Sequence, residues 1–166
     1  MVKPRRISAA CATVHVVAVT LLLALAACDD AGKTPPIAVA GGSFIFNYRD
    51  AAATYGITLK LARAMPKGTV IEAEFENPAG GAPVRVRETV VDERRGYALE
   101  TPPLSGVVAD RDYLVVVRLR EAAGEREIHR LEHRIRSGLD QSVLPDKPLT
   151  VGPGYAPNPD GAVRQP

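Results

Sequence analysis

The chain has 166 residues, with 21 Lys and Arg, 19 Asp and Glu, and a formal net charge of +2. That length predicts one small domain. Three of the positive charges, Lys3, Arg5 and Arg6, precede a long uncharged run, so the chain from residue 28 onward carries 18 basic and 19 acidic residues. A nearly neutral chain does not favour binding to nucleic acid, and we expect no such partner.

Residues 7–27 are uncharged and rich in alanine and leucine, and they follow the basic residues. This layout is typical of a secretory signal peptide. The run is also about long enough to span a membrane. Its first half contains scattered polar residues, however, and it ends in small residues followed by cysteine, which favours cleavage over a membrane-spanning helix.

The sequence Leu25-Ala26-Ala27-Cys28 resembles the lipobox of bacterial lipoproteins. The resemblance implies cleavage between Ala27 and Cys28, a diacylglycerol thioether on Cys28, and an acyl chain on the new amino terminus. Two or three acyl chains would anchor the protein stably, because a single chain is marginal. Cys11 leaves with the signal, so no intramolecular disulfide is predicted. No other cofactor is expected.

The residue after the lipobox is Asp29, which resembles the signal that retains enterobacterial lipoproteins in the inner membrane. We therefore expect a lipid-anchored protein of the bacterial cell envelope that faces the periplasm. Asp29 favours the inner membrane, and the outer membrane is the alternative location.

The two ends of the mature chain are rich in proline and glycine. The composition predicts a lipidated tether over residues 28–42, a folded domain over 43–151, and a disordered tail over 152–166. Residues 1–27 form the predicted signal peptide.

The folded region alternates apolar and polar residues with the period of a β-strand. Turns with Pro and Gly separate the strands. Expected strands lie within 43–48, 56–63, 69–77, 83–91, 97–104, 112–121 and 127–138, and the segment 149–151 also fits a last strand. About seven short strands at this spacing predict an all-β fold, an antiparallel immunoglobulin-like or Greek-key β-sandwich.

Two segments of this pattern allow alternatives. In "EIHRLEHRIRSG" (127–138), Ile128, Leu131 and Ile135 also fit one face of a helix, but alternation after a hairpin turn favours a strand. Tyr113 opens the strongest strand, where it is either an ordinary core residue or the hydrogen-bonding tyrosine of a tyrosine corner.

Few residues suggest chemistry. His129 and His133 would share a metal on a helix, whereas on a strand they lie about 13 Å apart. The alternating Glu72, Glu74 and Glu76 predict a solvated polar strand face. A calcium site near Asp110 and Asp112 lacks the spaced ligand pattern that such sites require. We predict no catalytic residues and no metal site.

Arginines gather on two strands expected to pair, mostly on the outward face. Interleaved glutamates make cross-strand ion pairs one explanation. The other is a face that docks an acidic partner or lipid headgroups. The candidate residues for that face are Arg118, Arg120, Arg130, Arg134 and Arg136.

The order of these segments resembles the YscW/YbaY family of bacterial envelope lipoproteins over residues 55–151. A strand leads into Met65-Pro66-Lys67-Gly68 and a strand that ends at Phe75; a strand from Tyr113 to Arg120 and a hairpin at Gly124 follow. The family has a proline pair where this chain has the single Pro66, and its acidic, threonine-rich last strand is replaced here by "EIHRLEHRIRSG". The resemblance implies an antiparallel β-sandwich and a pilotin or chaperone role in some members.

The expected function is therefore that of a non-enzymatic accessory lipoprotein that binds another envelope protein. The alternatives are a small-ligand-binding envelope protein and, less favoured, an envelope hydrolase or metalloenzyme. The sequence predicts no oligomeric state.

Overall fold

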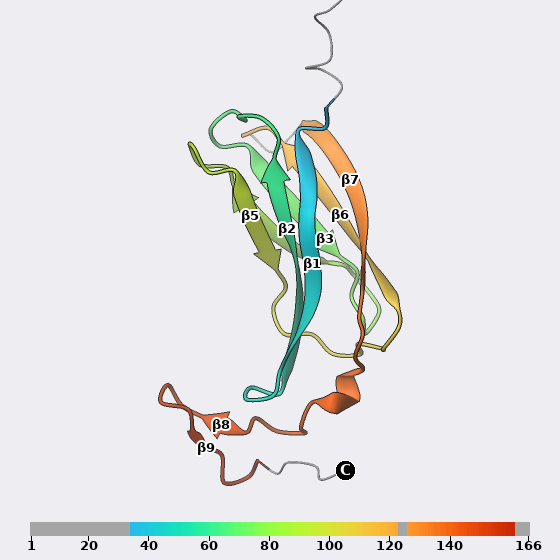
Figure 1. Ribbon diagram of the computed structural model, residues 1–166, viewed down its shortest axis with the longest axis vertical. Coiled ribbons are helices and arrows are strands. Elements are labelled where there is room, and N and C mark those ends of the chain that lie inside the picture. The colour runs from blue at the N-terminus through green and yellow to red at the C-terminus, as the bar shows by residue number, and fades with distance from the viewer. Residues whose placement is uncertain (1–33, 123–125, 162–166) are drawn as a thin grey trace, which may run out of the picture. The chain divides into compact units, whose positions relative to one another are not determined.

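The computed structural model describes residues 34–122 and 126–161 (Figure 1). In this part of the chain there are nine strands, one short 3-10 turn and no α-helix. The first seven strands are β1 (Ile37–Asn47), β2 (Ala52–Leu61), β3 (Val70–Phe75), β4 (Val84–Thr89), β5 (Gly96–Glu100), β6 (Asp112–Arg120) and β7 (Glu127–Arg136). The turn η2 (Gln141–Val143), β8 (Thr150–Val151) and β9 (Ala156–Pro157) follow.

The strands form three antiparallel sheets, so the predicted all-β, antiparallel class is confirmed. One sheet has the order β1-β2-β5, the second has the order β4-β3-β6-β7, and β8 pairs with β9. Consecutive strands β2 and β3 lie in different sheets, as do β4 and β5 and then β5 and β6. The chain therefore crosses between the two larger sheets three times.

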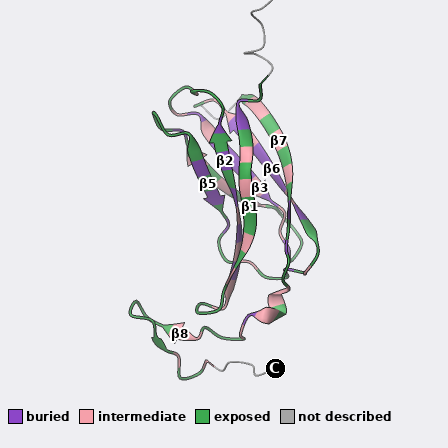
Figure 2. Ribbon diagram, viewed as in Figure 1, coloured by how far each residue is buried: buried purple, intermediate pink, exposed green. Residues whose placement is uncertain are grey.

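The buried residues of both larger sheets belong to one hydrophobic core. Figure 2 colours the buried positions along the strands purple. The Tyr55 ring of β2 stacks on Phe44 of β1 with centroids 4.4 Å apart, and it meets the Phe75 ring of β3 edge-on at 5.0 Å. Such aromatic pairs add about 0.5–1.5 kcal/mol beyond the burial of their surface. The fully buried members include Ile57, Leu59, Ile71, Tyr97, Leu99, Val107, Tyr113, Val115 and Leu119.

Residues 127–136 form a strand, and the helical alternative is wrong. β7 pairs antiparallel with β6, with Leu131 opposite Val117 and Ile135 opposite Tyr113. The period of two places Ile135 in the core and leaves Arg134 and Arg136 exposed.

Both predicted boundaries of the folded domain are wrong. β1 begins at Ile37, six residues before the predicted start at 43, because Ile37 and Val39 pair with Leu61 and Leu59 of β2. Ile37 is buried in the core. A β-bulge between Val39 and Gly41 lets the glycine-containing segment continue the strand.

At the other end, the chain continues in ordered turns beyond residue 151, where disorder was predicted. Val151 pairs with Ala156, and the Asn158 backbone N–H donates to the carbonyl of Leu149 at 2.9 Å. The Asn158 side chain also donates to the Pro148 carbonyl at 2.6 Å. Prolines and glycines therefore mark the turns of a small hairpin. The predicted signal peptide, the lipidation site Cys28 and Asp29 lie outside the described residues.

Candidate functional site

The outer face of the β4-β3-β6-β7 sheet carries the arginines that were predicted from the sequence to form a partner surface. Strand register places Glu72 of β3 between Arg87 of β4 and Arg118 of β6, and Arg118 in turn lies opposite Arg130 of β7. The charges therefore alternate in sign across β4, β3 and β6, which is the arrangement that favours cross-strand ion pairs.

Glu72 is buried although its side chain belongs to the outward face; the residue is only 3% exposed. Its carboxylate lies 2.5 Å from Arg87 Nη2, 3.5 Å from Arg120 Nε and 4.0 Å from Arg118 Nη1. The prediction of a solvated acidic face is wrong at this residue, because arginines of both neighbouring strands cover the carboxylate. A carboxylate removed from water in this way needs such partners.

Glu74 forms the second centre of the ion-pair network. Its carboxylate lies 2.6 Å from Arg118 Nη1, and its Oε1 accepts a hydrogen bond from Arg85 Nε at 2.7 Å. The Arg118 contact, with a smaller contribution from Arg85, lowers the pKa of Glu74 below its ordinary value. The same contact raises the pKa of Arg118. Arg118 thus remains a cation held against the sheet.

The five candidate arginines differ in how available they are to a partner. The side chains of Arg118 and Arg120 are 14% and 27% exposed and contact glutamates on the sheet. Arg130 pairs with Glu132, and Arg136 lies 3.3 Å from Asp110 and 3.6 Å from Asp112. Arg134 is exposed and forms no ion pair with any residue that the structure describes. It is the candidate whose charge is most available.

Arg134 lies next to an apolar hollow that was not predicted from the sequence. In the register of β6 and β7, Arg134 lies directly opposite Leu114. Leu114, Val116, Pro83, Glu74 and Glu76 line a hollow of about 160 Å³ on the outer face. The signal in the sequence was the presence of Leu114 and Val116 at the outward positions of a strand whose other outward residues are charged.

Glu76 fixes the rim of this hollow. One carboxylate oxygen accepts a hydrogen bond from the backbone N–H of Leu114 at 2.9 Å, and the other accepts from Arg111 Nη2 at 2.6 Å. The Arg111 guanidinium also lies over the Tyr113 ring, 4.8 Å from its centroid. These contacts tie the end of β3 to the start of β6. The hollow therefore has an apolar floor and a fixed acidic edge, and the exposed Arg134 lies on the neighbouring strand β7.

The other residues singled out from the sequence take structural positions. His129 and His133 are half-buried residues of β7 and lie opposite Leu119 and Val115 of β6. The two histidines are too far apart along the strand to share one metal ion. Asp110 and Asp112 both contact Arg136. Within residues 34–122 and 126–161 there is no group of three or more potential metal-ligating side chains.

Tyr113 makes the contact that was expected of a tyrosine corner. Its ring is fully buried, and its hydroxyl accepts a hydrogen bond from the backbone N–H of Val108 at 2.8 Å. The contact fixes the loop between β5 and β6 to the strand that follows it.

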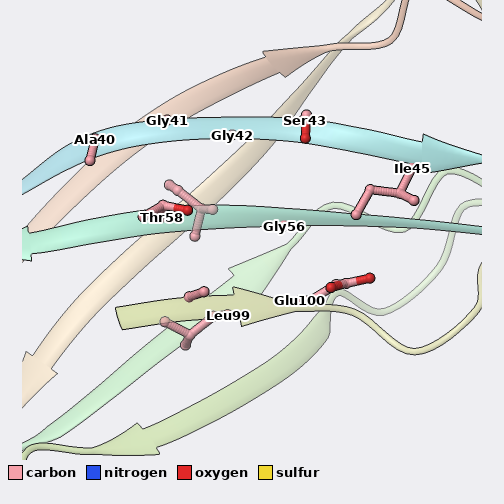
Figure 3. A pocket seen from close by; sticks show the side chains of 11 residues that line it. Ala40, Gly41, Gly42, Ser43, Ile45, Gly56, Thr58, Leu99 and Glu100 are labelled. Carbon is pink, nitrogen blue, oxygen red and sulfur yellow. The ribbon is translucent and has the colours of Figure 1, made fainter. Parts of the chain in front are cut away.

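A second hollow, of about 300 Å³, lies on the β1-β2-β5 sheet (Figure 3). Small residues line most of it, among them Gly41, Ser43 and Gly56, with Glu100 and Ile45 at its border. Thr54 Oγ1 donates a 2.5 Å hydrogen bond to Glu100. A side chain at position 56 would meet the Leu99 carbonyl at 2.8 Å, so close packing of β2 against β5 requires glycine there.

No protein-family model matches the chain, and no curated protein matches it significantly. The resemblance to the YscW/YbaY family therefore stays a prediction. In the described part of the chain, no helix has the length and apolar character needed to cross a membrane.

Proposed function

We propose that this chain is a lipid-anchored protein of the bacterial cell envelope that acts by binding another envelope protein and performs no chemistry of its own. The support for the anchor is the lipobox Leu25–Cys28 with the basic and apolar segments before it. The observation that carries the binding role is the hollow at Leu114 and Val116 with the exposed Arg134 beside it.

The proposed fold is an immunoglobulin-like β-sandwich. The strand orders β1-β2-β5 and β4-β3-β6-β7, the repeated crossing between these sheets and their common core support it. The Tyr113–Val108 hydrogen bond, at the point where β6 begins, supports it as well. Domains of this architecture commonly work as binding modules, which is an argument by analogy with the fold.

The chemistry of the hollow defines the partner segment. Leu114 and Val116 offer an apolar floor. Arg134, which lies opposite Leu114 on β7, offers a guanidinium that can take a carboxylate in two parallel hydrogen bonds. We infer that the partner presents an apolar side chain next to an acidic one. A pilotin- or chaperone-like role, as the family resemblance implies for some members, is compatible with such a segment. The small-ligand and enzyme alternatives stay predictions.

Site-specific photo-crosslinking in intact cells tests this proposal. A photoreactive residue at Glu132, which is exposed and neighbours Val116 in the register, should give a discrete crosslinked product. The matched control is the same residue at Thr58, which is exposed on the other sheet. Arg134→Glu should abolish the product and Arg134→Lys should retain part of it. A product of equal yield from both sheets, or one indifferent to Arg134→Glu, would contradict the proposal.

A further inference from the structure

The chain enters β1 at one end of the folded domain, and hydrogen bonding joins this entry point to the neighbouring strand. The Ala62 backbone N–H donates to the Pro36 carbonyl at 2.9 Å, which joins the end of β2 to the start of β1. The β2–β3, β4–β5 and β6–β7 connections lie at this same end (Figure 1). We call it the anchor-proximal end, defined by residues 62–69, 90–95 and the described part of 121–126.

The early start of β1 shortens the link between the proposed anchor and this end. Ile37 lies nine positions after Cys28, and this stretch spans at most about 32 Å at roughly 3.3–3.6 Å per residue. The domain start predicted from sequence, residue 43, lies fifteen positions after Cys28 and would have allowed about 54 Å. A lipidated Cys28 would therefore hold the anchor-proximal end within a short distance of the bilayer surface.

The two ends of the domain differ in charge. By sequence, the three connections of the anchor-proximal end contain five basic and four acidic residues. The connections at the opposite end, residues 48–51, 76–83, 101–111 and 137–149, contain three basic and five acidic residues. The net charge is therefore +1 at the anchor-proximal end and −2 at the opposite end, a difference that favours the first end as the one next to an anionic leaflet.

The anchor-proximal end also carries the apolar surface that a membrane interface requires. A hollow of about 560 Å³ is lined by Met65, Pro66 and Ile128, with Arg63, Arg126 and Glu121 among its other residues. Arg126 is exposed and forms an ion pair with Glu121, which a lipid phosphate would have to displace or share. Met65 and Ile128 pack partly against the core, so the floor of the hollow is fixed by the fold. Val91, in the neighbouring connection, is 49% exposed. Apolar groups beside arginines are the pattern of surfaces that rest at the headgroup region.

We propose that the anchor-proximal end rests against an anionic bilayer, with Arg63 and Arg126 contacting lipid phosphates and Met65 and Val91 facing the headgroup region. This inference rests on the proposed lipid anchor. The consequence is that the outer face of β6 and β7, with Arg134, projects along the membrane surface and away from the anchor end, where a membrane-bound partner can reach it.

Depth-dependent fluorescence quenching on the full lipoprotein tests this contact. Met65→Cys and, as the matched control at the opposite end, Tyr48→Cys each introduce a single reactive thiol, because Cys28 is blocked by lipid. The labelled proteins are reconstituted into vesicles of phosphatidylcholine, with or without phosphatidylglycerol, that contain a headgroup quencher. We expect the label at position 65 to be quenched several-fold more than the label at position 48, chiefly with phosphatidylglycerol and less at high salt.

Charge variants test whether Arg63 and Arg126 produce the preference for anionic vesicles. Arg63→Glu with Arg126→Glu should remove the preference for anionic vesicles, and Arg63→Lys with Arg126→Lys should keep it, with unchanged circular dichroism in both. Inorganic phosphate at matched ionic strength should leave the quenching unchanged; competition by phosphate would assign the hollow to a free anion and overturn the proposal.

Two outcomes distinguish an error in the proposed membrane contact from an error in the proposed lipid anchor. Vesicles that float with lipidated protein but quench both labels equally would overturn the membrane contact alone. A chain whose Cys28 carries no lipid, by mass, would overturn both.

Discussion

The hydroxyl of Tyr55 donates a 2.5 Å hydrogen bond to the backbone carbonyl of Glu76. Tyr55 lies on β2 of one sheet, and Glu76 directly follows β3 of the other. Burial, with a smaller contribution from the Glu76 charge, raises the pKa of the Tyr55 phenol, so it stays a proton donor at physiological pH. The bond fixes the two sheets to each other at the residue whose carboxylate also borders the Leu114 hollow.

Tyr55→Phe should therefore destabilise the protein. The substitution keeps the ring in its stack with Phe44 but leaves the Glu76 carbonyl without this donor, at a cost of about 1–3 kcal/mol. Urea unfolding of the detergent-solubilised lipoprotein measures the change. Tyr155→Phe, at a tyrosine that is 58% exposed, is the control and should change stability by less than about 0.5 kcal/mol. Equal effects of the two variants would refute the role of the bond.

Replacement of Glu72 should be far more costly than replacement of a surface glutamate. Glu72→Ala leaves Arg118 and Arg120 partly buried without one of their anions, and breaking such a pair costs about 3–5 kcal/mol. Glu132→Ala removes only an exposed partner of Arg130, with an expected cost of about 0–1 kcal/mol. Thermal unfolding of both variants side by side decides the matter: similar midpoints would mean that the Glu72 network is not structurally important.

The free energy of unfolding should fall in acid because the Glu74 carboxylate becomes protonated. Because its pKa in the folded protein is lowered, the contribution of the Glu74 carboxylate is complete above its unfolded pKa of about 4.3 and is lost as the pH falls through the lower folded value. Urea midpoints measured from pH 6 to pH 3 should decline in this window. Glu74→Gln should flatten the decline, whereas the Glu132→Gln control should not; an unchanged pH profile in Glu74→Gln would contradict the assignment.

The residue that follows the proposed lipidation site should govern which membrane holds the protein. Asp29→Ser should move the protein from the inner-membrane fraction toward the outer-membrane fraction on a sucrose gradient. Asp30→Ser, one residue further along, is the matched control and should leave the distribution as it is. An identical distribution of wild type and Asp29→Ser would remove the sorting role.

The strand pattern was readable from sequence because alternation reports directly which residues face a core. Even the ambiguous segment 127–136 followed its period of two. The burial of Glu72 could not be predicted from alternation. Alternation places the Glu72 side chain on the outward face. Its burial, however, depends on which arginines of the neighbouring strands cover it. The register between strands that are distant in sequence decides this, and local sequence does not encode that register.

The same limit applies to the candidate binding surface. Five arginines looked equivalent in the sequence, and only the register separates the covered Arg118 from the exposed Arg134 opposite Leu114. The start of β1 was missed for another reason. Ala-Gly-Gly weakens the strand signal of residues 37–42, and pairing with β2 overrides that weakness.

The proposed anchor makes Cys28 the lipidated amino terminus of an envelope protein. Mass spectrometry of the protein extracted from bacterial membranes tests it most directly. The amino-terminal peptide should begin at Cys28 and carry the mass of a diacylglyceryl group with or without an additional acyl chain, and Cys28→Ser should release no such peptide. A mature chain that begins at Met1, or an unmodified Cys28, would contradict the proposed lipid anchor.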